Sequence, residues 1–209
     1  MGSTQKKDKD SISTDPQTLI TVSSVVYALM AVVGMVIIAF SSASENSSLF
    51  QLPASSQEQL RLGVFTLLGS AVLIVLGLYF ELHFKSFKAT KKELGKIFSQ
   101  CTIPTGLYLA AISSIGEEIL FRGAILPFTG IFGSAIIFGL LHFGPSMRLT
   151  SWTLWAILAG ILLGWMFDTS GTLWVPILCH FLVNSFSIMR LRVNYLQQEE
   201  KRCRLDENK

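Results

Sequence analysis

Charged residues are scarce in this chain. Only 15% of its 209 residues are Asp, Glu, Lys or Arg, whereas 50% are hydrophobic, and the mean hydropathy is +0.51. Ordinary soluble domains carry about 25% charged residues, so the composition excludes that class and indicates an integral membrane protein. Cysteine is also rare: three residues without paired spacing argue against the disulfide framework of small secreted domains.

Hydrophobic runs are present instead, and six of them meet or approach the roughly 20 residues that a helix needs to cross about 30 Å of hydrocarbon. The predicted spans are 19–40, 62–80, 103–126, 131–143, 152–167 and 173–189. The fourth is short, so it is either buried among its neighbours or extends beyond these limits. The predicted fold is therefore all-α, a polytopic bundle of about six transmembrane helices.

Basic residues gather at one end of these spans. Because positively charged loops stay on the cytosolic side, a cytosolic N-terminus fits best, since it places 15 of the 17 basic residues in cytosolic segments. These are Lys6, Lys7, Lys9, Lys85, Lys88, Lys91, Lys92, Lys96, Arg148, Arg190, Arg192, Lys201, Arg202, Arg204 and Lys209. We expect both termini to be cytosolic and the host to be the cell membrane.

The basic loop KSFKATKKELGKIFSQ interleaves lysines with Phe87, Leu94, Ile97 and Phe98. Two interpretations of this loop stay open. It lies on the surface of an anionic leaflet, or it is a solvated linker that fixes the topology.

One predicted span contains two carboxylates and an arginine, in the stretch SSIGEEILFRG. A charge at bilayer depth costs roughly 2.5–3.5 kcal/mol on insertion scales, so such residues usually face a protein interior or a wet cavity. Glu118 and Arg122 are four residues apart on one helix face, within reach of an ion pair. Glu117 lies about 100° around the helix from Glu118, so the same arginine cannot readily serve it. Glu117 therefore needs another reason for its burial.

Partners for Glu117 can come from two later spans. His142 ends the segment FGLLH, in which Phe138 lies one turn earlier, and His180 lies one turn before Asn184 in HFLVN. At about 1.5 Å per residue, these groups all fall within a turn or two of the midplane and can meet in one polar pocket. A lone histidine or asparagine in a membrane often only bonds a neighbouring helix, but the whole set at similar depth favours a functional site.

Three motifs thus stand in order on separate hydrophobic segments. EEILFR fits Glu-Glu-x-x-x-Arg, FGLLH fits Phe-x-x-x-His and HFLVN fits His-x-x-x-Asn. Together they resemble the CPBP family of intramembrane proteases, also called Abi proteins, which includes CAAX prenyl endopeptidases and bacteriocin-processing or immunity proteins. The resemblance implies a four-helix catalytic core over 100–190, preceded by an N-terminal tail (1–18) and two spans with the basic loop (19–99), and followed by a C-terminal tail (191–209).

The resemblance also implies peptide-bond hydrolysis in a water-filled cavity that opens toward the cytosol. Glu117 would be the base that activates water, His142 would hold or polarise that water, and His180 and Asn184 would stabilise the oxyanion. The supporting residues would be Glu118, Arg122 and Phe138.

A metal is the open alternative for this mechanism. Glu, His, His and Asn are a plausible zinc set, but the sequence has no His-Glu-x-x-His helix and Asn is an uncommon zinc ligand. The prediction is therefore a metal-free glutamate mechanism, with zinc on Glu117, His142 and His180 as the alternative.

The expected partners are the lipid bilayer and a membrane-associated peptide or protein substrate, either a prenylated CAAX protein or a bacteriocin-like peptide; no nucleic acid is expected. A function of another class stays open, namely a non-proteolytic membrane scaffold or immunity protein whose pocket binds without cleaving. A small transporter is a weaker alternative, because the sequence shows no inverted repeat.

Overall fold

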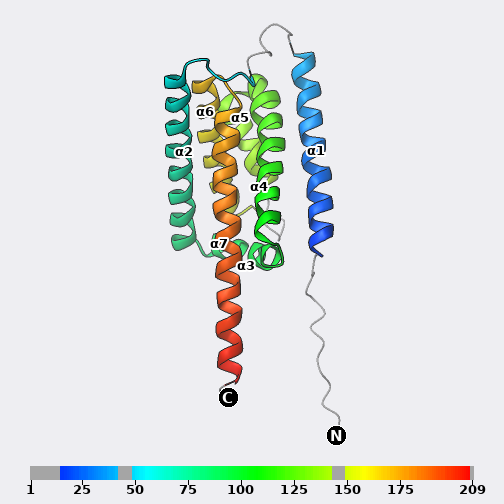
Figure 1. Cartoon of the computed structure of the whole chain (residues 1–209), viewed down its shortest axis with the longest axis vertical. Helices are drawn as coiled ribbons and strands as arrows, with labels where there is room; N and C mark the ends of the chain where they lie inside the picture. The colour runs from blue at the N-terminus through cyan, green and yellow to red at the C-terminus, as the bar shows by residue number, and fades with distance from the viewer. Residues whose placement is uncertain (1–14, 42–48, 143–148, 208–209) are drawn as a thin grey trace.

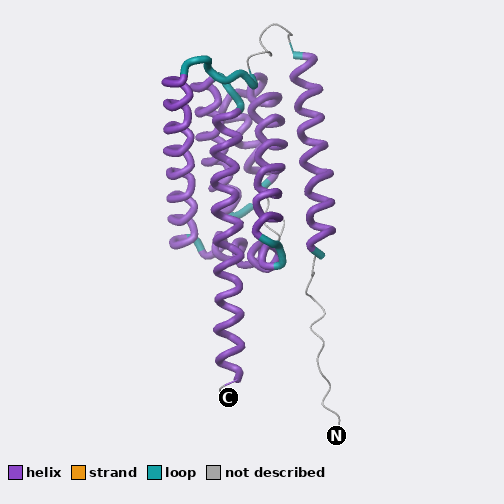
Figure 2. The backbone as a smooth tube through the Cα atoms, viewed as in Figure 1, coloured by secondary structure: helices purple, strands orange, loops and turns teal. Residues whose placement is uncertain are grey.

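The computed structural model describes residues 15–41, 49–142 and 149–207, and over these ranges it contains helices and no strand (Figure 2). The helices are α1 (Pro16–Phe40), α2 (Ser56–His83), α3 (Lys85–Ser99), α4 (Ile103–Glu118), the π-helix η2 (Ile119–Ile125), α5 (Leu126–Leu141), α6 (Ser151–Ser170) and α7 (Trp174–Glu207). Outside the described ranges lie residues 1–14 of the predicted N-terminal tail, Phe143, Arg148 and Lys209. The all-α prediction is confirmed.

Five helical stretches in the described residues are long and apolar enough to cross a membrane, and one of them runs continuously over Ile103–Leu141. This stretch is not straight. The rings of Phe121 and Phe138 lie 5.0 Å apart, although 17 residues of straight helix would separate them by about 25 Å. The chain reverses at Gly130, whose φ of +68° is a conformation that glycine adopts without strain. The third and fourth predicted spans are thus two antiparallel segments of one helical run.

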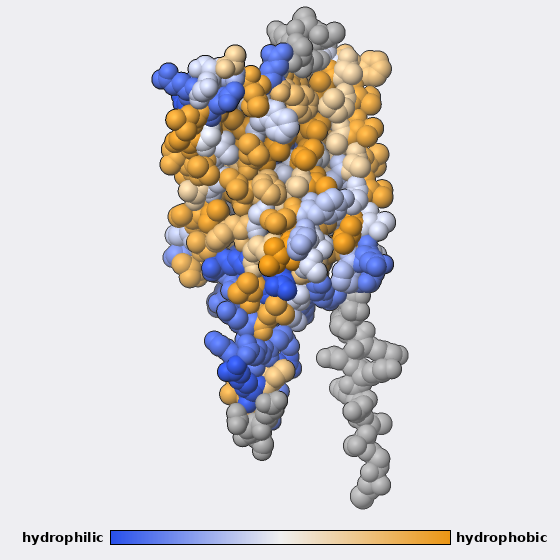
Figure 3. Space-filling view, viewed as in Figure 1, coloured by the Kyte–Doolittle hydropathy of each residue, from blue (hydrophilic) through white to orange (hydrophobic). Residues whose placement is uncertain are grey.

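The face of the bundle seen in Figure 3 is apolar over most of its height. Exposed large hydrophobic side chains include Leu29 on α1, Leu67 and Leu68 on α2, and Phe132 on α5. Soluble monomers rarely expose so continuous an apolar surface, so this is the face that lipid covers. The chain is an integral membrane protein.

α7 is longer than a membrane span. Its 34 residues extend about 51 Å, well beyond a hydrocarbon core of about 30 Å. Its C-terminal part leaves the bundle and carries a hydrophilic surface (Figures 1 and 3). The predicted C-terminal tail is therefore a continuation of the last helix over its described residues.

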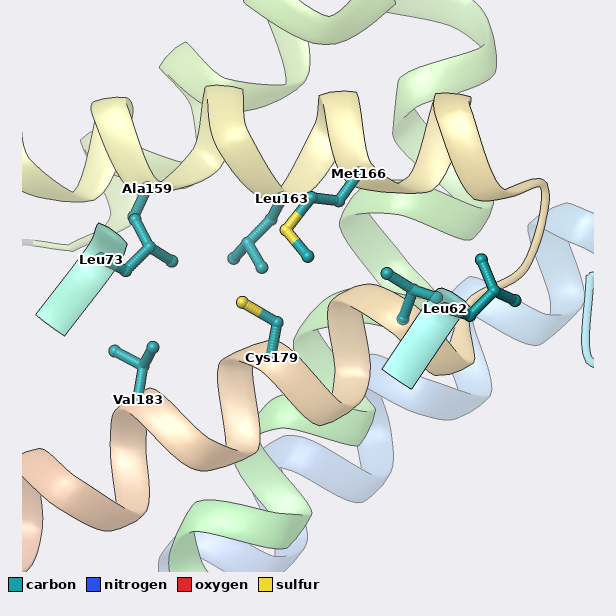
Figure 4. Packing of buried hydrophobic residues seen from close by; sticks show 8 residues of the cluster. Leu62, Leu73, Ala159, Leu163, Met166, Cys179 and Val183 are labelled. Atoms are coloured by element: carbon teal, nitrogen blue, oxygen red, sulfur yellow. The ribbon is translucent and has the colours of Figure 1, made fainter. Parts of the chain in front are cut away.

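α2, α6 and α7 meet inside the bundle (Figure 4). A cluster of buried side chains fills this junction, formed by Leu62, Leu73, Ala159, Leu163, Met166, Val175, Cys179 and Val183. Cys179 is a free thiol that packs here as a small hydrophobic residue. The cluster fixes α7, which carries two of the predicted site residues.

α3 packs on the protein at the end of the bundle from which α7 emerges (Figure 1). Phe87 is buried against Trp152 and Trp155, with ring centroids 5.2 and 6.1 Å away. The apolar face of the basic loop is thus turned toward α2, α6 and α7. Neither interpretation from the sequence describes this arrangement fully, because the loop is an ordered helix whose apolar side covers the bundle.

Gly116 lets α1 approach α4 next to Glu117. A Cβ atom at Gly116 would lie 2.6 Å from the carbonyl oxygen of Tyr27, a distance that real Cβ atoms essentially never show. We expect Gly116→Ala to lower the free energy of unfolding by about 1–3 kcal/mol, because the backbone of α1 must move away. Denaturation in detergent measures this loss. Gly63→Ala on α2 is the matched control, since nothing lies within 4 Å of a Cβ there. Equal effects of the two variants would contradict the close approach.

Candidate active site

The two adjacent glutamates lie where α4 passes into the π-helix η2. Glu117 is 6% exposed, and Glu118 and Arg122 are fully buried. A π-turn is wider than an α-turn and is frequent at functional sites. The Ser134 hydroxyl of α5 donates to the Phe121 carbonyl at 3.0 Å, so a side chain of the returning segment satisfies a backbone group of η2.

Arg122 forms the predicted ion pair with Glu118. Its Nη1 donates to Glu118 Oε1 at 2.9 Å, and its Nη2 donates to the Gly160 carbonyl of α6 at 3.2 Å. The guanidinium also lies 4.6 Å from the centroid of the Phe138 ring. These contacts make the burial of one carboxylate and one cation tolerable.

His180 connects the two glutamates. Its Nδ1 lies 2.7 Å from Glu118 Oε1, and its Nε2 lies 3.7 Å from Glu117 Oε2. Because the carboxylate paired with Arg122 is ionised and only accepts, Nδ1 carries the hydrogen. Glu118 therefore orients the imidazole and leaves Nε2 directed at Glu117.

His142 is oriented in the same way from α5. Its Nδ1 lies 2.8 Å from the Phe138 carbonyl, which only accepts, so Nδ1 again carries the hydrogen. Its Nε2 lies 3.8 Å from Glu117 Oε2. The ring also packs on Phe138, with centroids 4.2 Å apart.

Glu117 Oε2 is thus a buried oxygen between two imidazole nitrogens, and among the described residues it has no hydrogen-bond partner. The separations of 3.8 and 3.7 Å are too long for direct hydrogen bonds. The arrangement thus directs two imidazole nitrogens at one carboxylate oxygen.

Asn184 completes the set from α7. Its Nδ2 donates to Ser113 Oγ at 3.1 Å, and Ser113 in turn donates to the Ala110 carbonyl at 3.1 Å. Asn184, Glu117, His142 and His180 all line one cavity of about 270 Å³ whose walls are largely apolar. The structure therefore brings together all four residues that were predicted as catalytic. Of the three supporting residues, Phe138 lines the same cavity, whereas Glu118 contacts His180 and Arg122 contacts Glu118.

The segment that holds the three motifs matches a known protein family. Residues 99–186, which hold all three motifs and the segment from α4 to the first half of α7, match the model of a family described as type II CAAX prenyl endopeptidase, Rce1-like. The predicted resemblance to the CPBP family is thus confirmed over this segment. The uncharacterized protein YpbD of Bacillus subtilis (strain 168) is 32% identical over 107 residues, which are 50% of this chain and 55% of that protein. The chain thus spans about half the length of this relative. No solved structure matches the present chain.

One wall of the cavity comes from outside the matched segment. Tyr27 of α1 lines the cavity and interacts with the Glu117 side chain. From the sequence, this helix was predicted only as a preceding span. Ser23 and Tyr27, at i and i+4 in a mostly apolar run, were the available signal.

Over the part of the chain that the structure describes, no group of three or more His, Cys, Asp or Glu side chains is arranged to hold a metal ion. The metal-free mechanism and zinc on Glu117, His142 and His180 both stay predictions.

Proposed function

We propose that the protein is an intramembrane endopeptidase that hydrolyses a peptide bond of a membrane-associated substrate with water activated by Glu117. The observation that supports this is the buried Glu117 Oε2, flanked by His142 Nε2 and His180 Nε2. The family description names an endopeptidase, which agrees with the proposal.

In the first step, Glu117 takes a proton from a water molecule held between its carboxylate and His142 Nε2. The resulting hydroxide attacks the carbonyl carbon of the scissile peptide bond. Glu117 then returns the proton to the leaving nitrogen as the C–N bond breaks, which yields a carboxylate and an amine. Glu118 is less suited to this role, because its Oε1 accepts from both Arg122 and His180 and, unlike Glu117, it does not line the cavity.

The oxyanion needs donors, and Asn184 and His180 are placed to supply them. One hydrogen of the Asn184 amide is directed to Ser113, which leaves the second for the substrate oxygen. His180 Nε2, directed at Glu117, is a donor in the imidazolium form. In studied enzymes, one lost oxyanion donor costs about 2.7–4 kcal/mol.

The cavity also suits an apolar substrate. Thr90, Leu94 and Phe98 of α3 line it beside Trp152 and Trp155, and its walls carry few polar groups away from the motifs. The cavity therefore reaches the basic end of the bundle, which the positive-inside rule predicts to be cytosolic. A prenylated CAAX peptide and a hydrophobic bacteriocin-like peptide both fit this description.

The test uses wild-type protein in proteoliposomes, a prenylated CAAX peptide, the same peptide without its prenyl group, and a hydrophobic bacteriocin-like peptide. Each is incubated with and without a chelator, and products are followed by mass spectrometry. We expect cleavage of at least one peptide at a rate that chelation does not change. Loss of cleavage on chelation, with recovery on adding zinc, would overturn the metal-free mechanism in favour of zinc.

A further inference from the structure

A second cavity, the basic groove, lies between α3 and α7 outside the catalytic set. Its volume is about 340 Å³, and the Glu81 carboxylate of α2 lies at one side of it. The α3 wall is basic and is formed by Lys85, Lys88, Lys91 and Lys92. The α7 wall is neutral and polar and includes Asn194, Tyr195 and Gln198. Cations thus face hydrogen-bonding groups across a groove that the proposed reaction does not use.

The positive charge of the basic groove is largely uncompensated. Glu81 is already bound, at 2.7 Å by Lys91 and at 3.5 Å by Arg190. In the described part of the chain, Lys85, Lys88 and Lys92 form no ion pair. Three lysines are therefore left to bind an anion from outside the protein.

The position of the groove indicates which anion this is. α3 lies where the apolar band of the surface ends and hydrophilic residues begin (Figures 1 and 3). On the adjoining turn of α2, Leu82 is 82% exposed, and Tyr79 and Val75 continue the exposed apolar face toward the middle of the bundle. A ligand that carries both a phosphate and acyl chains gains contacts with both surfaces, whereas a soluble anion gains contacts only with the lysines.

We propose that the basic groove binds the headgroup of an anionic phospholipid of the leaflet at this end of the bundle. The phosphate lies on Lys88 and Lys92, which are four residues apart on one helix face. The headgroup hydroxyls bond to Asn194 and Gln198, and the acyl chains follow the exposed face of α2. Basic pockets at the ends of membrane helices are a recurrent setting for anionic lipids.

The basic groove also adjoins the catalytic cavity. Leu191 lines both, and the other face of α3 contributes Thr90, Leu94 and Phe98 to the cavity wall. A headgroup in the groove thus ties α3 to α7 at the edge of the cavity. Binding itself does not depend on proteolysis, so its test is independent of the proposed function.

The experiment titrates the purified full-length protein in neutral detergent with phosphatidylglycerol, phosphatidylcholine or inorganic phosphate. Bound lipid is counted by native mass spectrometry, and the melting temperature is recorded. We expect phosphatidylglycerol alone to bind tightly and to raise the melting temperature. The exposed pair Lys88→Gln with Lys92→Gln is expected to weaken binding at least tenfold while leaving the lipid-free melting temperature unchanged.

Lys96→Gln with Lys201→Gln is the matched control, because it removes the same charge from exposed lysines that do not line the groove. This control is expected to bind phosphatidylglycerol as the wild type does. Equal weakening by both double variants would overturn the proposal, since binding would then follow net charge alone. Equal binding of phosphatidylcholine, or full stabilisation by inorganic phosphate, would overturn it as well.

Discussion

Glu117→Gln is expected to slow peptide cleavage by about 10²–10⁴-fold, the usual contribution of general acid–base catalysis. Glutamine has nearly the same shape but cannot take a proton from water. The substitution leaves the contacts among Glu118, Arg122 and His180 in place, since none of them depends on Glu117. The variant should therefore fold and bind substrate as the wild type does.

Single-turnover cleavage and peptide binding, measured in the same proteoliposomes, separate these effects. Glu93→Gln is the control, because Glu93 is exposed on α3, pairs with Lys96 at 3.4 Å and does not line the cavity. It should cleave at the wild-type rate. If Glu117→Gln also cleaved at that rate, the base would have to be another group.

Arg122→Met is expected to lower the free energy of unfolding by about 3–5 kcal/mol, because it leaves Glu118 buried without its cation. Both side chains of this pair are at most 1% exposed. Arg61→Met is the comparison, because it removes the same kind of partner from Glu58 at the surface. The Arg61 side chain is 72% exposed and that of Glu58 is 38% exposed, so the expected loss of unfolding free energy is about 0–1 kcal/mol.

Unfolding by denaturant in detergent compares the two arginine variants directly. Adding Glu118→Gln to Arg122→Met should recover part of the lost stability, since it removes the unpaired charge. Similar small losses for Arg122→Met and Arg61→Met would show that the buried pair does not stabilise the fold.

Much of the site was predictable because helix geometry acts locally. The i, i+4 spacing of Glu118 and Arg122 predicted their ion pair, and counting residues along each span placed Glu117, His142 and His180 at similar depth. Apolar run lengths were likewise sufficient to predict the membrane-spanning helices. These inferences need only the regular rise and rotation of a helix.

Other features depend on contacts between distant segments and left no local signal. The π-helix η2 spans ILFRGAI, which reads as ordinary apolar helix, yet the carbonyl of its Phe121 accepts from Ser134 on the returning segment. The amphipathic pattern of α3 showed an apolar face, but not that this face packs on Trp152 and Trp155. The role of Tyr27 depends on the packing of α1 against Gly116, which a span prediction does not contain.

The central claim is that this membrane cavity hydrolyses a peptide bond, and the most direct measurement is cleavage by the wild-type protein in water enriched in ¹⁸O. Proteoliposomes are incubated with the prenylated and unprenylated CAAX peptides and the bacteriocin-like peptide, and the products are weighed. The account predicts a single cut whose new carboxylate carries one solvent oxygen, and no such product with Glu117→Gln. Peptides that bind to the wild type and remain intact would contradict it and identify the pocket as a binding site of a membrane scaffold.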